Sequence, residues 1–156
     1  MRAPPRHASM LFPQPLKVAV FERDWARRSR YRVSLEAAGC ETMGFNTVEG
    51  LRVACRARGQ RFDVLLLACA GDVFSVARCL ALVEVDVLRT VPLLLVVEER
   101  QIHAVHEAVR GGPFDFVLPP LGDEELCIRV WRLCSPHAQS RPRQTVAQLL
   151  NSPVGP

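Results

Sequence analysis

The stretch Asp63-Val-Leu-Leu-Leu-Ala-Cys69 is the most hydrophobic short run in the first half of the chain. A short apolar run without alternation is typical of a strand buried on both faces, as at the centre of a parallel sheet. We therefore take residues 63–69 as a central strand and interpret the chain outward from it.

On both sides of this strand, short apolar runs alternate with helical patterns, which is the signature of β-α-β units. We expect strands at 17–21, 41–46, 63–69, 91–97 and 114–118, and helices at 25–38, 47–58, 73–88, 99–110 and 123–134. Five such units predict an α/β fold with a flavodoxin-like, doubly wound five-stranded parallel sheet between two helical layers. Ligands of such sheets bind at the carboxyl ends of the strands.

The ends of the chain differ from this middle part. Residues 1–16 and 135–156 are rich in proline and lack periodicity, so we expect an irregular leader, a domain at 17–134 and a linker-like tail. No apolar run has the length of a membrane span or the position of a signal peptide. We expect a cytoplasmic protein without a membrane partner.

Composition excludes several classes of function. The six cysteines include no C-x-x-C pair and the four histidines have no zinc spacing, so no metal or cofactor is expected. The net charge of +4 alone does not predict that this domain contacts nucleic acid directly. The sequence also lacks a glycine-rich phosphate loop, a nucleophile elbow and paired catalytic carboxylates, so no enzyme activity is expected.

Four segments, taken in their order along the chain, resemble the receiver domains of response regulators. The segments are Lys17-Val-Ala-Val-Phe-Glu-Arg-Asp24, Phe62-Asp-Val-Leu-Leu-Leu-Ala68, Thr90-Val-Pro-Leu-Leu-Leu-Val-Val97 and Gly112-Pro-Phe-Asp-Phe-Val-Leu-Pro-Pro-Leu121. The last one looks like the family's G-A-D-D-Y-L-x-K-P-F segment. The resemblance covers residues 17–134 and implies the CheY-like fold and a role in two-component, phosphorelay signalling in bacteria.

A working receiver, as the resemblance implies, needs Mg²⁺ held by acids, a phosphorylated aspartate, a Thr or Ser hydroxyl and a lysine. The matching positions here are Glu22 and Arg23 for the acids, Ala68 for the aspartate, Val97 for the hydroxyl and Pro119 for the lysine. Alanine carries no nucleophile, and a fixed arginine charge opposes a cation. A shifted alignment would make Asp72 the acceptor, but the hydroxyl and lysine would still be missing. We therefore expect a pseudo-receiver that is not phosphorylated.

In receivers, an aromatic residue on the fifth strand reports phosphorylation to the face formed by the fourth helix, fifth strand and fifth helix. Phe116 occupies that aromatic position without a hydroxyl partner. In OmpR/PhoB-type transcription factors the same face forms a homodimer, and the residues that match or substitute for its charged pairs are Arg110, Asp115, Glu125, Arg129 and Arg132. One expected basic position falls on Val105. The alternative is that these charges only solvate the surface.

The preferred hypothesis is a regulatory module that dimerises or docks a partner without phosphorylation, with a DNA-binding domain following Pro156. Within it, Arg23 either pairs with Glu22 and fills the vacant metal site or is simply solvated. A second hypothesis is a stand-alone adaptor that senses a ligand in the vacated pocket or an oxidant through Cys69. The alternative interpretation of Cys69 is a thiol packed in the core.

Overall fold

The computed structural model describes residues 15–70, 81, 90–108 and 114–134. Its elements are β1 (Lys17–Phe21), α1 (Trp25–Ala37), β2 (Glu41–Phe45), α2 (Val48–Arg56), β3 (Val64–Ala68), β4 (Leu93–Val96), a 3-10 turn (Glu99–Gln101), α5 (Ile102–Ala108), β5 (Phe114–Val117) and α6 (Asp123–Cys134). The helix expected at 73–88 lies outside the described residues.

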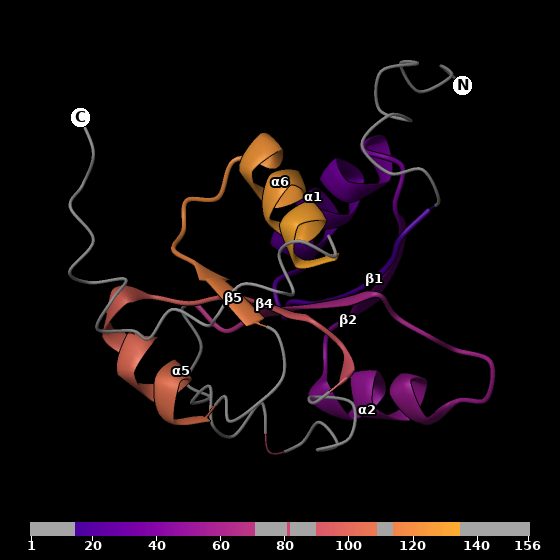
Figure 1. Ribbon diagram of the computed structural model, residues 1–156, viewed down its shortest axis with the longest axis horizontal. Coiled ribbons are helices and arrows are strands. Elements are labelled where there is room, and N and C mark those ends of the chain that lie inside the picture. Colours follow the sequence, from indigo (N-terminus) through magenta and orange to yellow (C-terminus); the bar gives the residue numbers. More distant parts are fainter. Residues whose placement is uncertain (1–14, 71–80, 82–89, 109–113, 135–156) are drawn as a thin grey trace.

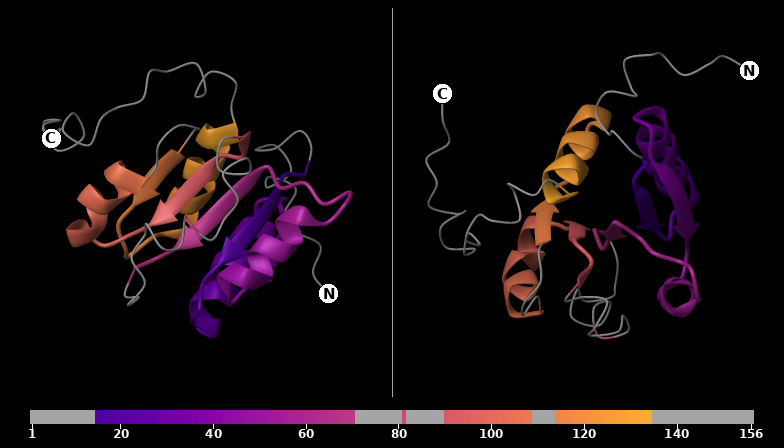
Figure 2. Two further views of the ribbon diagram at one scale, coloured as in Figure 1. Left: turned by 90° about the horizontal axis from the view of Figure 1, so that it is seen from below. Right: turned by 45° about the vertical axis from the view of Figure 1, so that its right-hand side comes forward.

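The five strands form one parallel sheet in the order β2-β1-β3-β4-β5. The strand β3 is central and all five of its residues are buried, as its unbroken apolar run predicts. Helices α1 and α6 cover one face of the sheet, and α2 and α5 cover the other (Figures 1 and 2). The predicted three-layer, flavodoxin-like architecture is therefore confirmed.

Alternation along the strands divides the core into two apolar clusters. On β3, Leu66 faces the cluster beneath α1 and α6, whereas Leu65 and Leu67 face the cluster beneath α2 and α5. The α6 side chains Leu126 and Val130 fill the first cluster and are at most 1% exposed. Because both faces of the sheet are covered, the strand ends are the part of the sheet that remains available for a site.

Local signals explain where α1 begins and ends. The Asp24 carboxylate accepts a hydrogen bond of 2.8 Å from the backbone N–H of Arg27, which caps the helix. Gly39 follows the helix with φ of 98°, a conformation that favours glycine. Tyr31, Leu35 and Ala38, which recur at helical spacing, are all buried. The helix is thus fixed directly after β1, beside the strand ends.

Among the described residues, no helix combines the length and apolar character needed to cross a membrane.

Candidate functional site

The carboxyl ends of β1, β3 and β4 bring together three of the positions singled out in the sequence. Phe21 of β1 lies in register with Leu67 of β3, so Glu22 follows beside Ala68. Ala68 is in register with Val96, and the next residue, Val97, donates a backbone hydrogen bond of 3.0 Å to Val117. The alignment inferred from sequence therefore places Glu22, Ala68 and Val97 at one edge of the sheet.

At this edge, the side chains that the resemblance matches to the receiver's acceptor and hydroxyl are hydrocarbon. Ala68 is 3% exposed and Val97 is fully buried. Neither side chain can attack a phosphoryl group or donate a hydrogen bond to one. Pro119, at the lysine position, is exposed two residues beyond β5, and its peptide bond to Pro120 is cis. None of these three positions supplies phosphoryl-transfer chemistry.

Glu22 is the exception, because it is the only buried polar or charged side chain among the described residues. Its Oε1 accepts hydrogen bonds from the backbone N–H of Asp24 at 2.9 Å and from Nη2 of Arg27 at 3.4 Å. Its Oε2 accepts from Nε of Arg27 at 3.3 Å. The hydrogen bond to Glu22 also raises the pKa of Arg27. The buried carboxylate is therefore neutralised by a cation from the first turn of α1.

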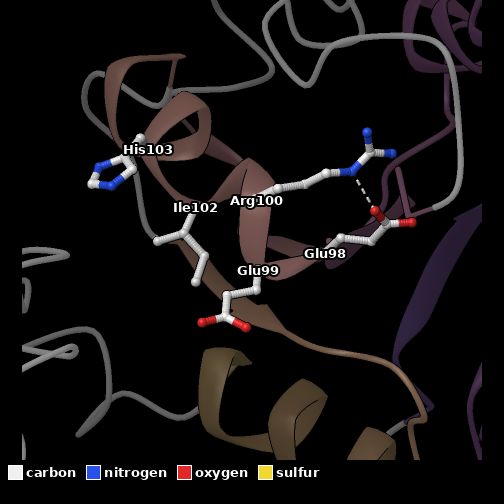
Figure 3. A pocket seen from close by; sticks show the side chains of 5 residues that line it. All are labelled: Glu98, Glu99, Arg100, Ile102 and His103. Carbon is white, nitrogen blue, oxygen red and sulfur yellow. Dashed lines mark hydrogen bonds and ion pairs between the residues drawn. The ribbon is translucent and has the colours of Figure 1, made fainter.

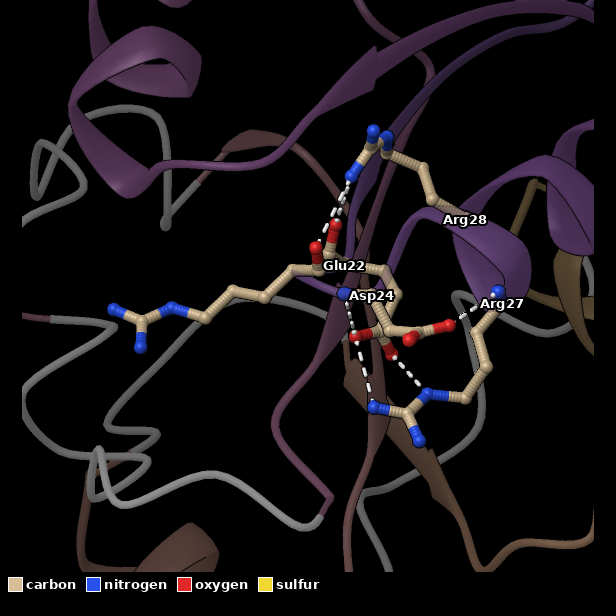
Figure 4. A network of polar contacts seen from close by, with 5 residues as sticks. Glu22, Asp24, Arg27 and Arg28 are labelled. Atoms are coloured by element: carbon tan, nitrogen blue, oxygen red, sulfur yellow. Dashed lines mark hydrogen bonds and ion pairs between the residues drawn. The ribbon is translucent and has the colours of Figure 1, made fainter.

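A second arginine of α1 holds the backbone of the same residue. Nη1 of Arg28 donates to the carbonyl oxygen of Glu22 at 2.8 Å and to that of Arg23 at 3.4 Å. Figure 4 shows Arg27 and Arg28 reaching Glu22 from different sides. The sequence had suggested Arg23 as the ion-pair partner of Glu22, but Arg27 makes that pair and Arg23 is exposed. The sequence did contain a signal for the pair with Arg27. If Asp24 caps α1, Arg27 lies in the first turn of the helix and therefore close to the end of β1.

The Mg²⁺ ion that the receiver resemblance implies does not fit these residues. Mg²⁺ prefers several oxygen ligands in octahedral geometry. Here the Glu22 carboxylate is already paired with the guanidinium of Arg27, and its neighbour on β3 is the methyl group of Ala68. The described part of the chain contains no group of three or more Asp, Glu, His or Cys side chains that could hold a metal ion.

Next to this edge, the turn between β4 and α5 is tied to the end of β3. The side chain of Gln101 donates from Nε2 to the carbonyl oxygen of Cys69 at 3.2 Å and accepts from the backbone N–H of Glu98 at 2.8 Å. Cys69 itself is 3% exposed and belongs to the apolar cluster under α2 and α5. Its surroundings fit a packed core thiol better than an accessible sensor. Asp72, the alternative acceptor, lies outside the described residues.

An open pocket of about 680 Å³ lies on the outer side of the same turn. It is lined by Glu98, Glu99, Arg100, Ile102 and His103. Figure 3 shows Glu98 and Arg100 paired with each other, while Glu99 and His103 extend elsewhere along the turn and helix. Its lining does not include Glu22, Ala68 or Val97, so this pocket is separate from the strand-end positions described above.

Three charged residues of the face formed by α5, β5 and α6, namely Asp115, Glu125 and Arg129, pair within one chain. Arg129 contacts Asp115 at 3.0 Å and Glu125 at 3.6 Å. Arg132 is exposed, and Arg110 lies outside the described residues. Asp115, Glu125 and Arg129, for which the resemblance predicts cross-dimer pairs, thus make ion pairs within one chain, and the cross-dimer pairs stay a prediction.

Two apolar positions of this face are also placed by the structure. Val105, which occupies an expected basic position, is fully buried against the sheet. Phe116, at the switch position, is half-buried and packs against the cluster that contains Val97 and Val105.

No family model and no curated protein matches the sequence. Solved structures do match. A receiver domain protein from Clostridium thermocellum has a TM-score of 0.64 and 17% identity over 76% of this chain and 94% of its own. The chemotaxis response regulator CheY4 of Vibrio cholerae has a TM-score of 0.62 and 21% identity, and the match covers 77% of this chain and 99% of CheY4. Full-length FixJ from B. japonicum has a TM-score of 0.65 and 19% identity, and the match covers 81% of this chain and 63% of FixJ. The chain therefore has the fold of response-regulator receiver domains.

Proposed function

We propose that this chain is a pseudo-receiver: a non-enzymatic, cytoplasmic signalling module that acts through dimerisation or partner docking without being phosphorylated. The observation that carries the proposal is Ala68, whose methyl group stands at the end of the central strand β3, beside Glu22. Phosphorylation of a receiver requires a carboxylate nucleophile, and alanine offers none.

The internal ion pair at the strand ends supports the same proposal. In a receiver, Mg²⁺ offsets the charge of the acidic site; here Arg27 does so permanently, as part of the chain. An arginine side chain stays protonated at any physiological pH. The charge at this edge therefore does not depend on a metal or on a phosphoryl donor, and the module has one signalling state.

The partner surface in this proposal is the face formed by α5, β5 and α6, and the partner is a second copy of the chain. The linker-like composition of residues 135–156 supports a DNA-binding domain after Pro156, which would make the module the regulatory part of a bacterial transcription factor. FixJ, a structural neighbour, extends well beyond the part that matches this chain. A coding region without a DNA-binding domain downstream of Pro156 would remove this part of the proposal.

Sedimentation equilibrium with and without Mg²⁺ and beryllium fluoride, an analogue of an aspartyl phosphate, tests the proposal directly. We expect a dimer whose dissociation constant does not change when both reagents are added. A phosphorylatable receiver serves as the positive control for the reagents. A beryllofluoride-dependent shift from monomer to dimer would show that an aspartate acceptor exists and that the proposal is wrong.

The open pocket beside the β4–α5 turn supports a second candidate function, that of a ligand-sensing adaptor. Saturable binding of a small molecule that is lost when His103 or Glu99 is substituted would favour this candidate. A redox version predicts that Cys69→Ser abolishes a response to peroxide, and the burial of Cys69 argues against it.

A further inference from the structure

The outward side of α6 carries a stripe made of Glu124, Ile128 and Arg132. Residues four apart lie on the same side of a helix, one turn above another. The opposite side of α6 is buried in the core and contains Leu126, Cys127, Val130 and Leu133. All three residues of the stripe are exposed, and Ile128 is 39% exposed. Trp131, which is 45% exposed, lies three residues beyond Ile128 and adds a second large apolar side chain.

The other charges of α6 already have partners, which leaves the two charges of the stripe for another molecule. Asp123 contacts Arg30 at 3.7 Å and accepts from the Ser34 hydroxyl at 2.7 Å, both on α1. Glu125 and Arg129 form a chain with Asp115. Glu124 and Arg132 make no ion pair within the described part of the chain. They are therefore the charges for which a second molecule can provide opposite partners.

The arrangement of the stripe is self-complementary. Ile128 lies midway between an acid and a base, each about 6 Å away along the helix axis at 1.5 Å per residue. If a second α6 packs antiparallel across a two-fold axis at Ile128, each Glu124 faces an Arg132 and the two isoleucines meet at the centre. A parallel arrangement would instead place like charges opposite each other. Two-fold dimers of this kind, in which the same patch meets itself, are the commonest protein assemblies.

We infer that two copies of this chain associate through antiparallel α6 helices, with Ile128 and Trp131 as the apolar centre and Glu124–Arg132 pairs at both ends. This inference rests on the proposed function and specifies the surface through which its dimer forms. We call this surface, made of Glu124, Ile128, Trp131 and Arg132, the seam. One helix pair buries little area, so the association is weak and concentration-dependent. Because its end pairs are exposed, it also weakens as ionic strength rises.

The test is sedimentation equilibrium of the full chain with four variants. Ile128→Glu should raise the dissociation constant at least about tenfold, since it puts two like charges at the two-fold axis. Glu124→Arg and Arg132→Glu should each raise it several-fold, and the double variant Glu124→Arg/Arg132→Glu should return it to within about threefold of wild type. Val53→Glu is the matched control, because Val53 is 60% exposed on α2, across the sheet, and should leave the constant unchanged. Circular dichroism verifies that each variant is folded.

Each result bears on the seam separately from phosphorylation. Rescue by the double variant supports antiparallel α6 packing, because no change at a single site can restore complementarity. Absence of rescue, an Ile128→Glu variant that dimerises like wild type, or a wild-type chain that stays monomeric at every concentration overturns the inference. The pseudo-receiver proposal is judged by its insensitivity to beryllium fluoride, which can hold even where the seam fails.

Discussion

Arg27 pairs with the buried carboxylate of Glu22 through two of its nitrogens, although the arginine itself is 56% exposed. The pair thus joins a residue at the end of the sheet to the first turn of α1. In the proposed pseudo-receiver this pair takes the place of the divalent cation, and its removal has measurable consequences.

Arg27→Ala should destabilise the fold by about 1–3 kcal/mol, because it leaves a buried carboxylate without its charged partner. The exposure of Arg27 keeps the loss at the lower end of this range. The measurement is the free energy of unfolding in urea. Arg30→Ala is the control: its pair with Asp123 is exposed on both sides and its hydrogen bond to the Leu121 carbonyl oxygen is 3.3 Å long, so its loss should cost less than that of Arg27, at most about 1 kcal/mol. Equal losses in the two variants would contradict a structural role for the Glu22–Arg27 pair.

Stability should decrease as the pH rises above 9. Burial raises the pKa values of Cys40 and Cys134 to about 12, from 9.0 in an exposed thiol. Between these values, the unfolded chain loses thiol protons that the folded chain keeps, so unfolding is favoured by up to about 1.4 kcal/mol per pH unit for each thiol. Tyr31, whose pKa burial also raises, adds to the effect in the same direction.

Urea denaturation at several pH values between 7 and 11 measures this dependence. Cys134→Ala should reduce the slope above pH 9, because one of the titrating thiols is gone. The same thiols should be unreactive toward iodoacetamide at neutral pH in the folded protein, since the thiolate is the reactive form. Rapid native-state alkylation of Cys40 would contradict the prediction.

Asp115→Asn should leave the dimer dissociation constant within about twofold of wild type. The carboxylate of Asp115 is bound to Arg129 of its own chain, so its loss costs at most about 1 kcal/mol of folding stability and removes no contact between copies. Sedimentation equilibrium and urea denaturation separate the two effects. A large loss of association with unchanged stability would restore Asp115 to the cross-dimer role that the resemblance implies.

Gln101→Ala should loosen the turn between β4 and α5. The Gln101 side chain joins the backbone of Glu98 to that of Cys69, so its removal breaks two hydrogen bonds that hold the turn to the end of β3. Amide hydrogen exchange at Glu98 should increase about tenfold or more. His103→Ala, at an exposed position of the same helix, is the control and should leave the exchange at Glu98 unchanged.

The strands were predictable because central parallel strands are continuous apolar runs, and β3 lies within the predicted 63–69. Boundaries were less predictable. The fourth strand was expected at 91–97 and is observed at Leu93–Val96, and the helix expected from 99 begins with a 3-10 turn before α5. Such ends depend on local hydrogen bonds, here the Gln101 contacts, which apolar periodicity does not contain.

The same distinction holds at the site. Positions at strand ends, such as Ala68 and Val97, follow from register, which the apolar pattern determines. The partners of long charged side chains do not follow, because an arginine can reach acids on several elements. This is why Arg27 rather than Arg23 holds Glu22, and why Asp115 and Arg129 meet within one chain.

The hydrocarbon end of β3 has a consequence for engineering. Replacing Ala68 with aspartate would set a second carboxylate beside Glu22, at a buried edge where Arg27 is already engaged and Val97 and Pro119 offer it no donor. Such a variant bears the cost of an uncompensated charge, because these neighbours supply neither a free cation nor a hydroxyl to it. One substitution on β3 would therefore not convert the proposed pseudo-receiver into a phosphorylatable one, and the surrounding positions would have to change together.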